Sequence, residues 1–201
     1  ALPILTGIVD VIITTDTGSA TINNAFTYID NIILSVSITS DKYISLPITN
    51  IANSQGVAIE WGDGTYESLI TSDNPNYTYA NAGTYTIRVS GQFTNLDSTN
   101  ASASYKTGLQ SFTYSTQITS LTSFSKAFAN VTSPFTVDFG NNLTNNVTDM
   151  SYLFQNATGF NSSIVTLNTN AAENMSHMFD GASAFNQDVS IWNTSTVTDM
   201  S

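Results

Sequence analysis

The C-terminal part of the chain repeats itself with a period of 25 residues. Met150, Met175 and Met200 are evenly spaced (175 − 150 = 200 − 175 = 25), and NVTDMSYLFQNATGFN from Asn146 returns as AENMSHMFDGASAFN from Ala172. Five further pairs keep the interval: Phe154 and Phe179, Phe160 and Phe185, Asn161 and Asn186, Ile164 and Val189, and Leu167 and Trp192. A fixed period of this size is typical of a solenoid, in which each unit buries its apolar face against its neighbours.

The apolar residues of one unit predict its local structure. Met150, Leu153, Phe154 and Ala157 fall at i, i+3, i+4 and i+7, which predicts one face of a short helix, and Asp149 or its neighbour Thr148 can cap its start. The segment 164–167 then reads as a short strand. One helix and one strand per 25 residues is the geometry of a leucine-rich repeat.

The order of the recurring residues also resembles a known family. MSYLFQNATGFN and MSHMFDGASAFNQDVSIWNTSTVTDMS are similar to the repeats of BspA-like leucine-rich-repeat surface proteins, found in bacterial surface lipoproteins and adhesins and in some large viruses and protists. The first copy departs from that pattern, with Leu167 where the family has Trp and Ser162-Ser163 where it has Gln-Asp.

A second pattern lies upstream, where strand and turn signals arrive every eight to twelve residues. The expected strands are 32–38, 43–48, 57–61, 66–70, 77–79 and 84–90. This spacing predicts a small antiparallel sandwich.

Two segments of that region carry a further resemblance. In EWGDGT, Trp61 ends a strand, Gly62 and Gly64 permit a sharp turn, and Asp63 can accept backbone N–H bonds across it. In YTYANAGTYTIRV, a glycine turn joins two strands with alternate tyrosines facing inward, and its marker residues are Tyr79, Gly83 and Tyr85. Together they resemble the polycystic-kidney-disease (PKD) domain, an immunoglobulin-like extracellular module in which the Trp-Gly-Asp-Gly segment is chiefly structural.

These patterns predict a mainly β protein with short helices, built from a PKD-like β-sandwich followed by a leucine-rich-repeat-like solenoid. The expected parts are an N-terminal strand region or assembly arm (1–30), the sandwich (31–92), a polar linker (93–107), a degenerate capping repeat (108–145) and BspA-like repeats (146–201). Because the third copy is cut at Ser201, we expect the natural protein to continue or to meet a partner there.

Charge and hydrophobicity limit the partners. Four Lys plus Arg against fifteen Asp plus Glu give a net charge of −11, which repels phosphate backbones and anionic membranes, so we expect no nucleic-acid binding. The longest apolar runs are far too short to span a bilayer, so no membrane insertion is expected. With no cysteine, the chain has neither a disulfide framework nor a thiolate metal site.

Catalytic signals are weak. The single histidine, His177, occupies the position of Tyr152 in the preceding repeat, which favours a surface residue over a catalytic one. No Gly-x-Ser-x-Gly elbow is present. Asp63, with Glu60 or Asp73 nearby, could offer oxygen ligands to calcium, although an aspartate in such a turn more often satisfies backbone donors. No other cofactor is expected.

Asn-x-Ser/Thr sequons are frequent, but many arise by chance in a chain this rich in Asn, Ser and Thr. Asn161 recurs as Asn186, which favours a structural role for that side chain between coils. The nine candidate acceptors are Asn76, Asn100, Asn130, Asn142, Asn146, Asn156, Asn161, Asn174 and Asn193.

The functional expectation is a non-enzymatic adhesion or interaction protein, extracellular on a cell surface or virion, whose partners are other proteins or surface glycans. The alternative is a structural subunit that self-assembles through its N-terminal strands and the open solenoid end into a filament or coat. An accessory module of an enzyme would require a catalytic domain elsewhere in the reading frame.

Overall fold

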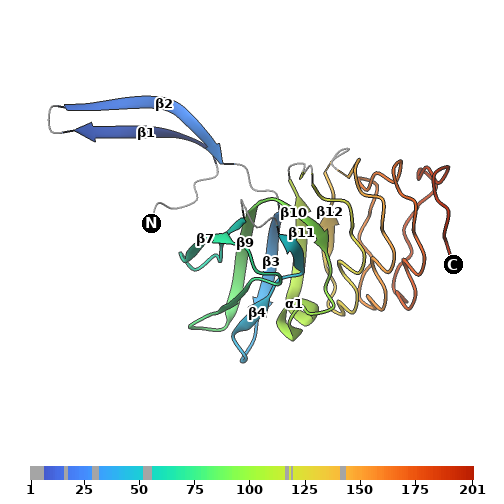
Figure 1. The fold of residues 1–201 in the computed structure, drawn as a ribbon. Helices are drawn as coiled ribbons and strands as arrows, with labels where there is room; N and C mark the ends of the chain where they lie inside the picture. Colours follow the sequence, from blue (N-terminus) through green and yellow to red (C-terminus); the bar gives the residue numbers. More distant parts are fainter. Residues whose placement is uncertain are drawn as a thin grey trace.

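The structure is a computed structural model, and it describes residues 7–15, 18–28, 32–51, 56–115, 118, 120–140 and 144–201, with backbone alone in the first two ranges. The described chain is mainly β, and its one α-helix is α1 (Ala103–Gly108). An N-terminal ribbon, a body of sheets and a row of stacked coils follow one another along the molecule (Figure 1).

The strands are short and mostly antiparallel. Their bounds are β1 (Gly7–Thr15), β2 (Gly18–Tyr28), β3 (Ile32–Ile38), β4 (Tyr43–Ser45), β5 (Ile48–Ile51), β6 (Val57–Glu60), β7 (Tyr66–Ile70), β8 (Asn76–Thr78), β9 (Gly83–Gly91), β10 (Phe93–Leu96), β11 (Leu109–Tyr114) and β12 (Thr136–Asp138).

A six-stranded sheet in the order β12-β11-β3-β9-β6-β7 forms the centre of the body. Its strand β3 pairs with β9 along its whole length, from Ile32 opposite Val89 to Ile38 opposite Gly83. Alternate residues of β3 are buried, as expected for a strand with one face on a core. The sheet does not close into a barrel, because β7 and β12 lie at its two ends.

Two smaller sheets, β4-β8 and β5-β10, complete the body. Their buried residues, such as Ile44, Ile48 and Phe93, belong to the same hydrophobic cluster as those of the large sheet. The segment 43–48, expected as one strand, is divided between β4 and β5. Pro47 lies at the division, and proline has no N–H to donate to a sheet.

The segment 93–107 is not the expected polar linker. It forms β10 and most of α1, and it buries Phe93, Leu96 and Tyr105 completely or nearly so. Its Ser98 is fully buried, and Ser98 Oγ donates to the carbonyl oxygens of Lys126 at 2.6 Å and Ala129 at 2.9 Å. Polarity alone predicted a loop because the sequence does not show these distant acceptors.

The repeats form stacked coils without helices, so the helix predicted in each repeat is wrong. Met150, Leu153, Phe154 and Ala157 are all fully buried, which the apolar pattern predicted correctly, but their backbone makes successive turns. The reason is a left-handed residue twice in each coil, Tyr152 (φ 56°) and Asn156 (φ 54°) in this one. A helix cannot pass through such residues. The segment 164–167, expected as a short strand, also contains a turn.

Backbone hydrogen bonds join each coil to the next. Met150 N–H donates to Asn174 O at 2.8 Å and Phe154 N–H to Met178 O at 2.9 Å, while the N–H groups of Leu153 and Ala157 bond within their own coil. The N–H groups of successive residues therefore bond alternately to the next coil and within their own coil. This satisfies the buried backbone groups without a helix or a continuous strand.

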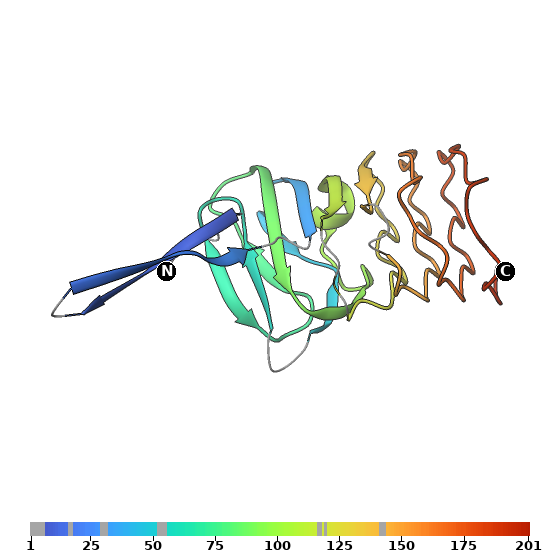
Figure 2. The same cartoon turned by 90° about the horizontal axis from the view of Figure 1, so that it is seen from above.

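The same ladder begins in the body. Parallel bridges run from Asn95 of β10 to Ser123, Asp149, Asn174 and Asp199 in successive coils. On another side, β12 (Thr136–Asp138) pairs in parallel with β11, which itself pairs with β3. Backbone pairing thus continues from the sheets into the coils at two places, and Figure 2 shows the coils as an extension of the body.

The N-terminal residues form a hairpin. Strands β1 and β2 pair with each other, with an irregularity between Val9 and Val11, and join none of the other sheets of the described chain. The hairpin projects from the body in both views (Figures 1 and 2).

Candidate functional site

The turn at Trp61–Thr65 is held by its own backbone and by a tyrosine. Trp61 N–H donates to Thr65 O at 3.0 Å, and both Gly62 (φ 84°) and Gly64 (φ 91°) take the left-handed conformation. A Cβ at Gly62 would lie 2.5 Å from Thr86 O, so this position requires glycine for space as well as for conformation.

Both carboxylate oxygens of Asp63 are engaged, one within this turn and one by Tyr77 of β8. Oδ1 accepts the Thr65 N–H at 3.0 Å, and Oδ2 accepts the Tyr77 hydroxyl at 2.9 Å. Partial burial raises the pKa of Asp63, but the hydrogen bonds from Thr65 and Tyr77 outweigh it and hold the pKa below its ordinary value. The carboxylate therefore supports the turn.

The other two residues considered for calcium are engaged elsewhere. Glu60 Oε2 lies 3.4 Å from Arg88 Nε in an ion pair between neighbouring strands, and Asp73 Oδ1 accepts the Ile51 N–H at 3.3 Å. Within the described ranges, no three His, Cys, Asp or Glu side chains gather into a group that could hold a metal ion. The geometry of Asp63 thus gives the calcium hypothesis no support.

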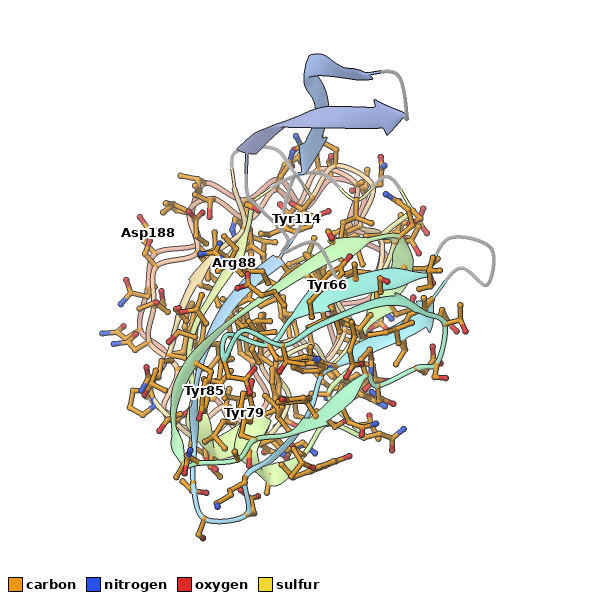
Figure 3. All side chains as sticks on the ribbon, turned by 90° about the vertical axis from the view of Figure 1, so that its left-hand side faces the viewer. Tyr66, Tyr79, Tyr85, Arg88, Tyr114 and Asp188 are labelled. Atoms are coloured by element: carbon orange, nitrogen blue, oxygen red, sulfur yellow. The ribbon has the colours of Figure 1, made fainter. Side chains whose placement is uncertain are left out.

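An aromatic cluster surrounds the turn. Trp61 stacks on Tyr77 with ring centroids 5.1 Å apart, and Tyr79 stacks on Tyr85 at 3.9 Å; Figure 3 shows Tyr79 and Tyr85 side by side. The Tyr79 hydroxyl donates to Trp61 O at 2.8 Å. Burial, and then the charge of Asp63, raise the pKa of Tyr79, which stays neutral and holds the strand end against the core. Gly83 opens β9 on the exposed side of this cluster.

Each coil of the stack starts with the same polar turn. Asp149 Oδ1 accepts the Ser151 N–H, Asn174 Oδ1 accepts the Ser176 N–H, and Asp199 accepts from Ser201, each at 3.0 Å. Asp149 caps this segment, as its position in the sequence predicts, although the segment is a turn and not a helix.

Phenylalanines form two columns through the coils. Phe154 stacks between Phe128 and Phe179, each at 5.5 Å, and Phe160 stacks on Phe185 at 5.7 Å. Met150 and Phe160 are fully buried, and Met175 is 5% exposed. Phe179, Phe185 and Trp192 of the last coil are half-buried and pack against this core.

On the surface, asparagine side chains of neighbouring coils bond to each other, and the same pair of positions is used again one coil later. Asn168 Nδ2 donates to Asn145 Oδ1 at 2.6 Å, and Asn193 Nδ2 donates to Asn170 Oδ1 at 3.1 Å. Asn161 Oδ1 accepts the backbone N–H of Asn186 at 2.8 Å. These bonds hold amides in rows along the stack.

His177 lies on the exposed side of the stack. Its ring stacks on the Tyr152 ring with centroids 4.8 Å apart. Lys126 Nζ lies 5.7 Å from the centroid of the Tyr152 ring. The three residues occupy equivalent left-handed positions in successive coils. His177 therefore continues a surface column.

The sequons fall in different environments. Asn76, in β8, and Asn100 are exposed. The amide nitrogen of Asn156 donates to Asn130 Oδ1 at 3.3 Å, and that of Asn193 donates to Asn170 Oδ1. Asn130, Asn146 and Asn161 are exposed, Asn174 is half-buried, and Asn142 lies outside the described residues.

Two grooves border the last coil. The larger, of about 560 Å³, is lined mainly by that coil, including Met175, Met178 and Trp192, and by Met200 and Ser201 of the segment that follows it. Inner coils are covered on the equivalent face by the next coil, so this groove has the shape of a stacking face. The smaller, of about 270 Å³, lies between residues 165–170 and residues 191–193 of the following coil.

The paired amides and the Tyr77 hydroxyl are not among the residues predicted from the sequence. Asn168 and Asn193 are 25 residues apart, as are Tyr152 and His177, so the period could have indicated both surface rows. No such signal marks Tyr77, which reaches Asp63 because its strand β8, in a separate sheet, packs its ring against Trp61.

No helix of the described chain is long and apolar enough to cross a bilayer.

Comparison with known proteins gives one match. A family model described as "Mycoplasma protein of unknown function, DUF285" matches residues 122–201, which are the stacked coils. Searches of curated proteins and of solved structures find no match.

Proposed function

We propose that the chain is a non-enzymatic, surface-exposed adhesion or interaction protein of a cell or virion. In this proposal a PKD-like β-sandwich (31–92) carries a BspA-like leucine-rich-repeat solenoid, and the solenoid presents the binding surface. The match of residues 122–201 to a family model supports the repeat assignment, and the Trp61–Thr65 turn with its tyrosines supports the sandwich.

The observation that carries the proposal is the row of surface amides held by backbone ladders. Asn145 with Asn168 and Asn170 with Asn193 are fixed by side-chain bonds between coils. Groups fixed before binding lose little conformational entropy when a partner arrives, so such a surface suits recognition. The net charge of −11 favours neutral or basic partners over anionic ones.

The test is binding of the fluorescently labelled 201-residue protein to a glycan array and to intact cells. We expect saturable binding that survives physiological salt, because neutral polar and apolar contacts are screened little. Binding that is absent, or that is lost in proportion to added salt, would contradict the proposal.

An alternative is a structural subunit, and the hairpin β1-β2 favours it. Two-stranded hairpins are marginally stable alone in water, and this one joins no other sheet of the described chain. Light scattering across a dilution series separates the two proposals: a mass near 21.6 kDa favours the adhesion module, whereas a large assembly that persists on dilution favours a filament or coat.

A further inference from the structure

The smaller groove combines amides with apolar groups. Its walls are residues 165–170 of one coil and Ile191, Trp192 and Asn193 of the next. Ile191 is 64% exposed and Val165 57% exposed, so neither packs in the core. Two exposed aliphatic side chains beside a tryptophan ring provide an apolar surface at the mouth of a polar groove.

The amides of the groove are oriented but retain donors. Asn170 uses its side-chain oxygen to accept from Asn193 Nδ2, and its backbone N–H donates to Asn168 Oδ1 at 2.9 Å. Within the described ranges, no protein acceptor takes a hydrogen from Asn170 Nδ2. Asn193 donates one of its two amide hydrogens along the row and keeps the other. These hydrogens can bind acceptor oxygens of a ligand.

Trp192 contributes an aromatic ring to the groove wall, and this ring also stacks on Phe179 with centroids 6.1 Å apart. The indole nitrogen of Trp192 is screened from water and has no partner among the residues that the structure describes. Because this nitrogen is screened from water, it offers no hydrogen bond at the groove surface, and the ring contributes contact area alone.

The chemistry of the walls selects the class of ligand. None of the residues that line the groove is charged. A volume of about 270 Å³ lies just below the range of about 300–1,000 Å³ that is usual for small-molecule pockets, which suits one terminal sugar of a chain. Sugars offer hydroxyl groups to amides and C–H faces to aliphatic and aromatic side chains.

We propose that this groove binds a terminal neutral sugar, with Asn170 and Asn193 donating to its hydroxyl groups and Ile191 and Trp192 contacting its apolar face. The inference rests on the proposed adhesive function and names its ligand class. Anionic sugars are disfavoured because the chain carries a net charge of −11.

The test is titration of the 201-residue protein with neutral trisaccharides of mannose, galactose and N-acetylglucosamine, followed by calorimetry, with a sulfated trisaccharide for comparison. The key variant is Asn170→Asp, which keeps the oxygen that accepts from Asn193 but removes the amide donors. Asn130→Asp is the matched control, because Asn130 Oδ1 accepts from Asn156 Nδ2 in the same way in another row.

We expect at least one neutral trisaccharide to bind, Asn170→Asp and Ile191→Ser each to weaken it tenfold or more, and Asn130→Asp to leave it unchanged. Thermal unfolding of each variant verifies the fold. Equal losses in the two aspartate variants, or no binding of any neutral trisaccharide, would overturn the inference. If the protein still binds the array or cells while Asn170→Asp has no effect, the adhesive function stands and the groove assignment fails.

Discussion

At the scale of single residues, the clearest constraint is the space around Gly62. Gly62 and Gly64 both have positive φ, but only Gly62 lies against the backbone of Thr86, and nothing lies within 4 Å of a Cβ built at Gly64. Substitution of Gly64 therefore tests conformational strain alone, whereas substitution of Gly62 tests strain together with a steric clash.

We expect Gly64→Ala to lower the free energy of unfolding by about 1 kcal/mol, the cost of a left-handed alanine. Gly62→Ala adds a backbone clash and should cost roughly 3 kcal/mol or more. Urea unfolding followed by tryptophan fluorescence measures both. Equal losses in the two variants would show that Thr86 does not restrict the turn.

Asp63 makes part of the stability depend on pH. Its pKa is lowered in the folded protein, so the carboxylate contributes stability above its unfolded pKa, near pH 4, and loses it as the pH falls through the lower folded value. We expect the stability of the wild type to fall more steeply than that of Asp63→Asn between about pH 4 and pH 2.

Thermal unfolding at each pH measures this difference. Asp188 and Asp199, whose pKa values are lowered by the N–H groups of Ser190 and Ser201, are present in both proteins, so their effect cancels in the comparison. Parallel pH profiles of the two proteins would refute a stabilising role for the Asp63 carboxylate.

At the scale of the element, each coil depends on the polar turn at its start. Asp149 and Asn174 accept the same N–H bond in successive coils, so the molecule itself shows that an amide can replace the carboxylate. Asp149→Ala should lower the free energy of unfolding by about 1 kcal/mol, as loss of a capping side chain does, whereas Asp149→Asn should change it little.

Chemical denaturation of the two variants decides this point. An equal loss in Asp149→Asn would mean that the charge, and not the hydrogen bond to Ser151, stabilises the coil.

The repeats also show what a sequence can predict. The period and the apolar positions identified the buried residues Met150, Phe154 and Phe160, because burial follows from hydrophobicity and spacing. The helix was wrong because spacing does not reveal backbone conformation: Tyr152 and Asn156 look compatible with a helix, and only the structure shows their positive φ.

The candidate site, like the repeats, could be predicted only in part from the sequence. The turn glycines and the capping role of Asp63 follow from local sequence, since both involve neighbouring residues. The bond from Tyr77 depends on the packing of β8 against Trp61, and the amide rows depend on the stacking of coils. Both bring together residues that local rules treat separately.

At the scale of the whole molecule, we expect the sheets and the coils to form one cooperative unit. Within the described residues, the ladder from Asn95 through Ser123 to Asp199 and the pairing of β12 with β11 join the sheets to the coils by backbone contacts. A substitution that destabilises the coils should therefore lower the stability of the sheets as well.

The most direct test uses Trp61 as a reporter. In the Trp192→Phe protein it is the remaining tryptophan, and it is fully buried among the sheets. Phe154→Ala removes a ring from the middle of the coils at a cost of about 3–5 kcal/mol, while Val165→Ala, at an exposed position of a coil, serves as control.

The measurement is urea unfolding followed by Trp61 fluorescence in the Trp192→Phe background. If the molecule is one unit, Phe154→Ala lowers the midpoint of the Trp61 transition by about 1 to 2 M with an unchanged slope, and Val165→Ala leaves it in place. A Trp61 midpoint that does not move, while circular dichroism shows the coils unfolding earlier, would contradict the claim.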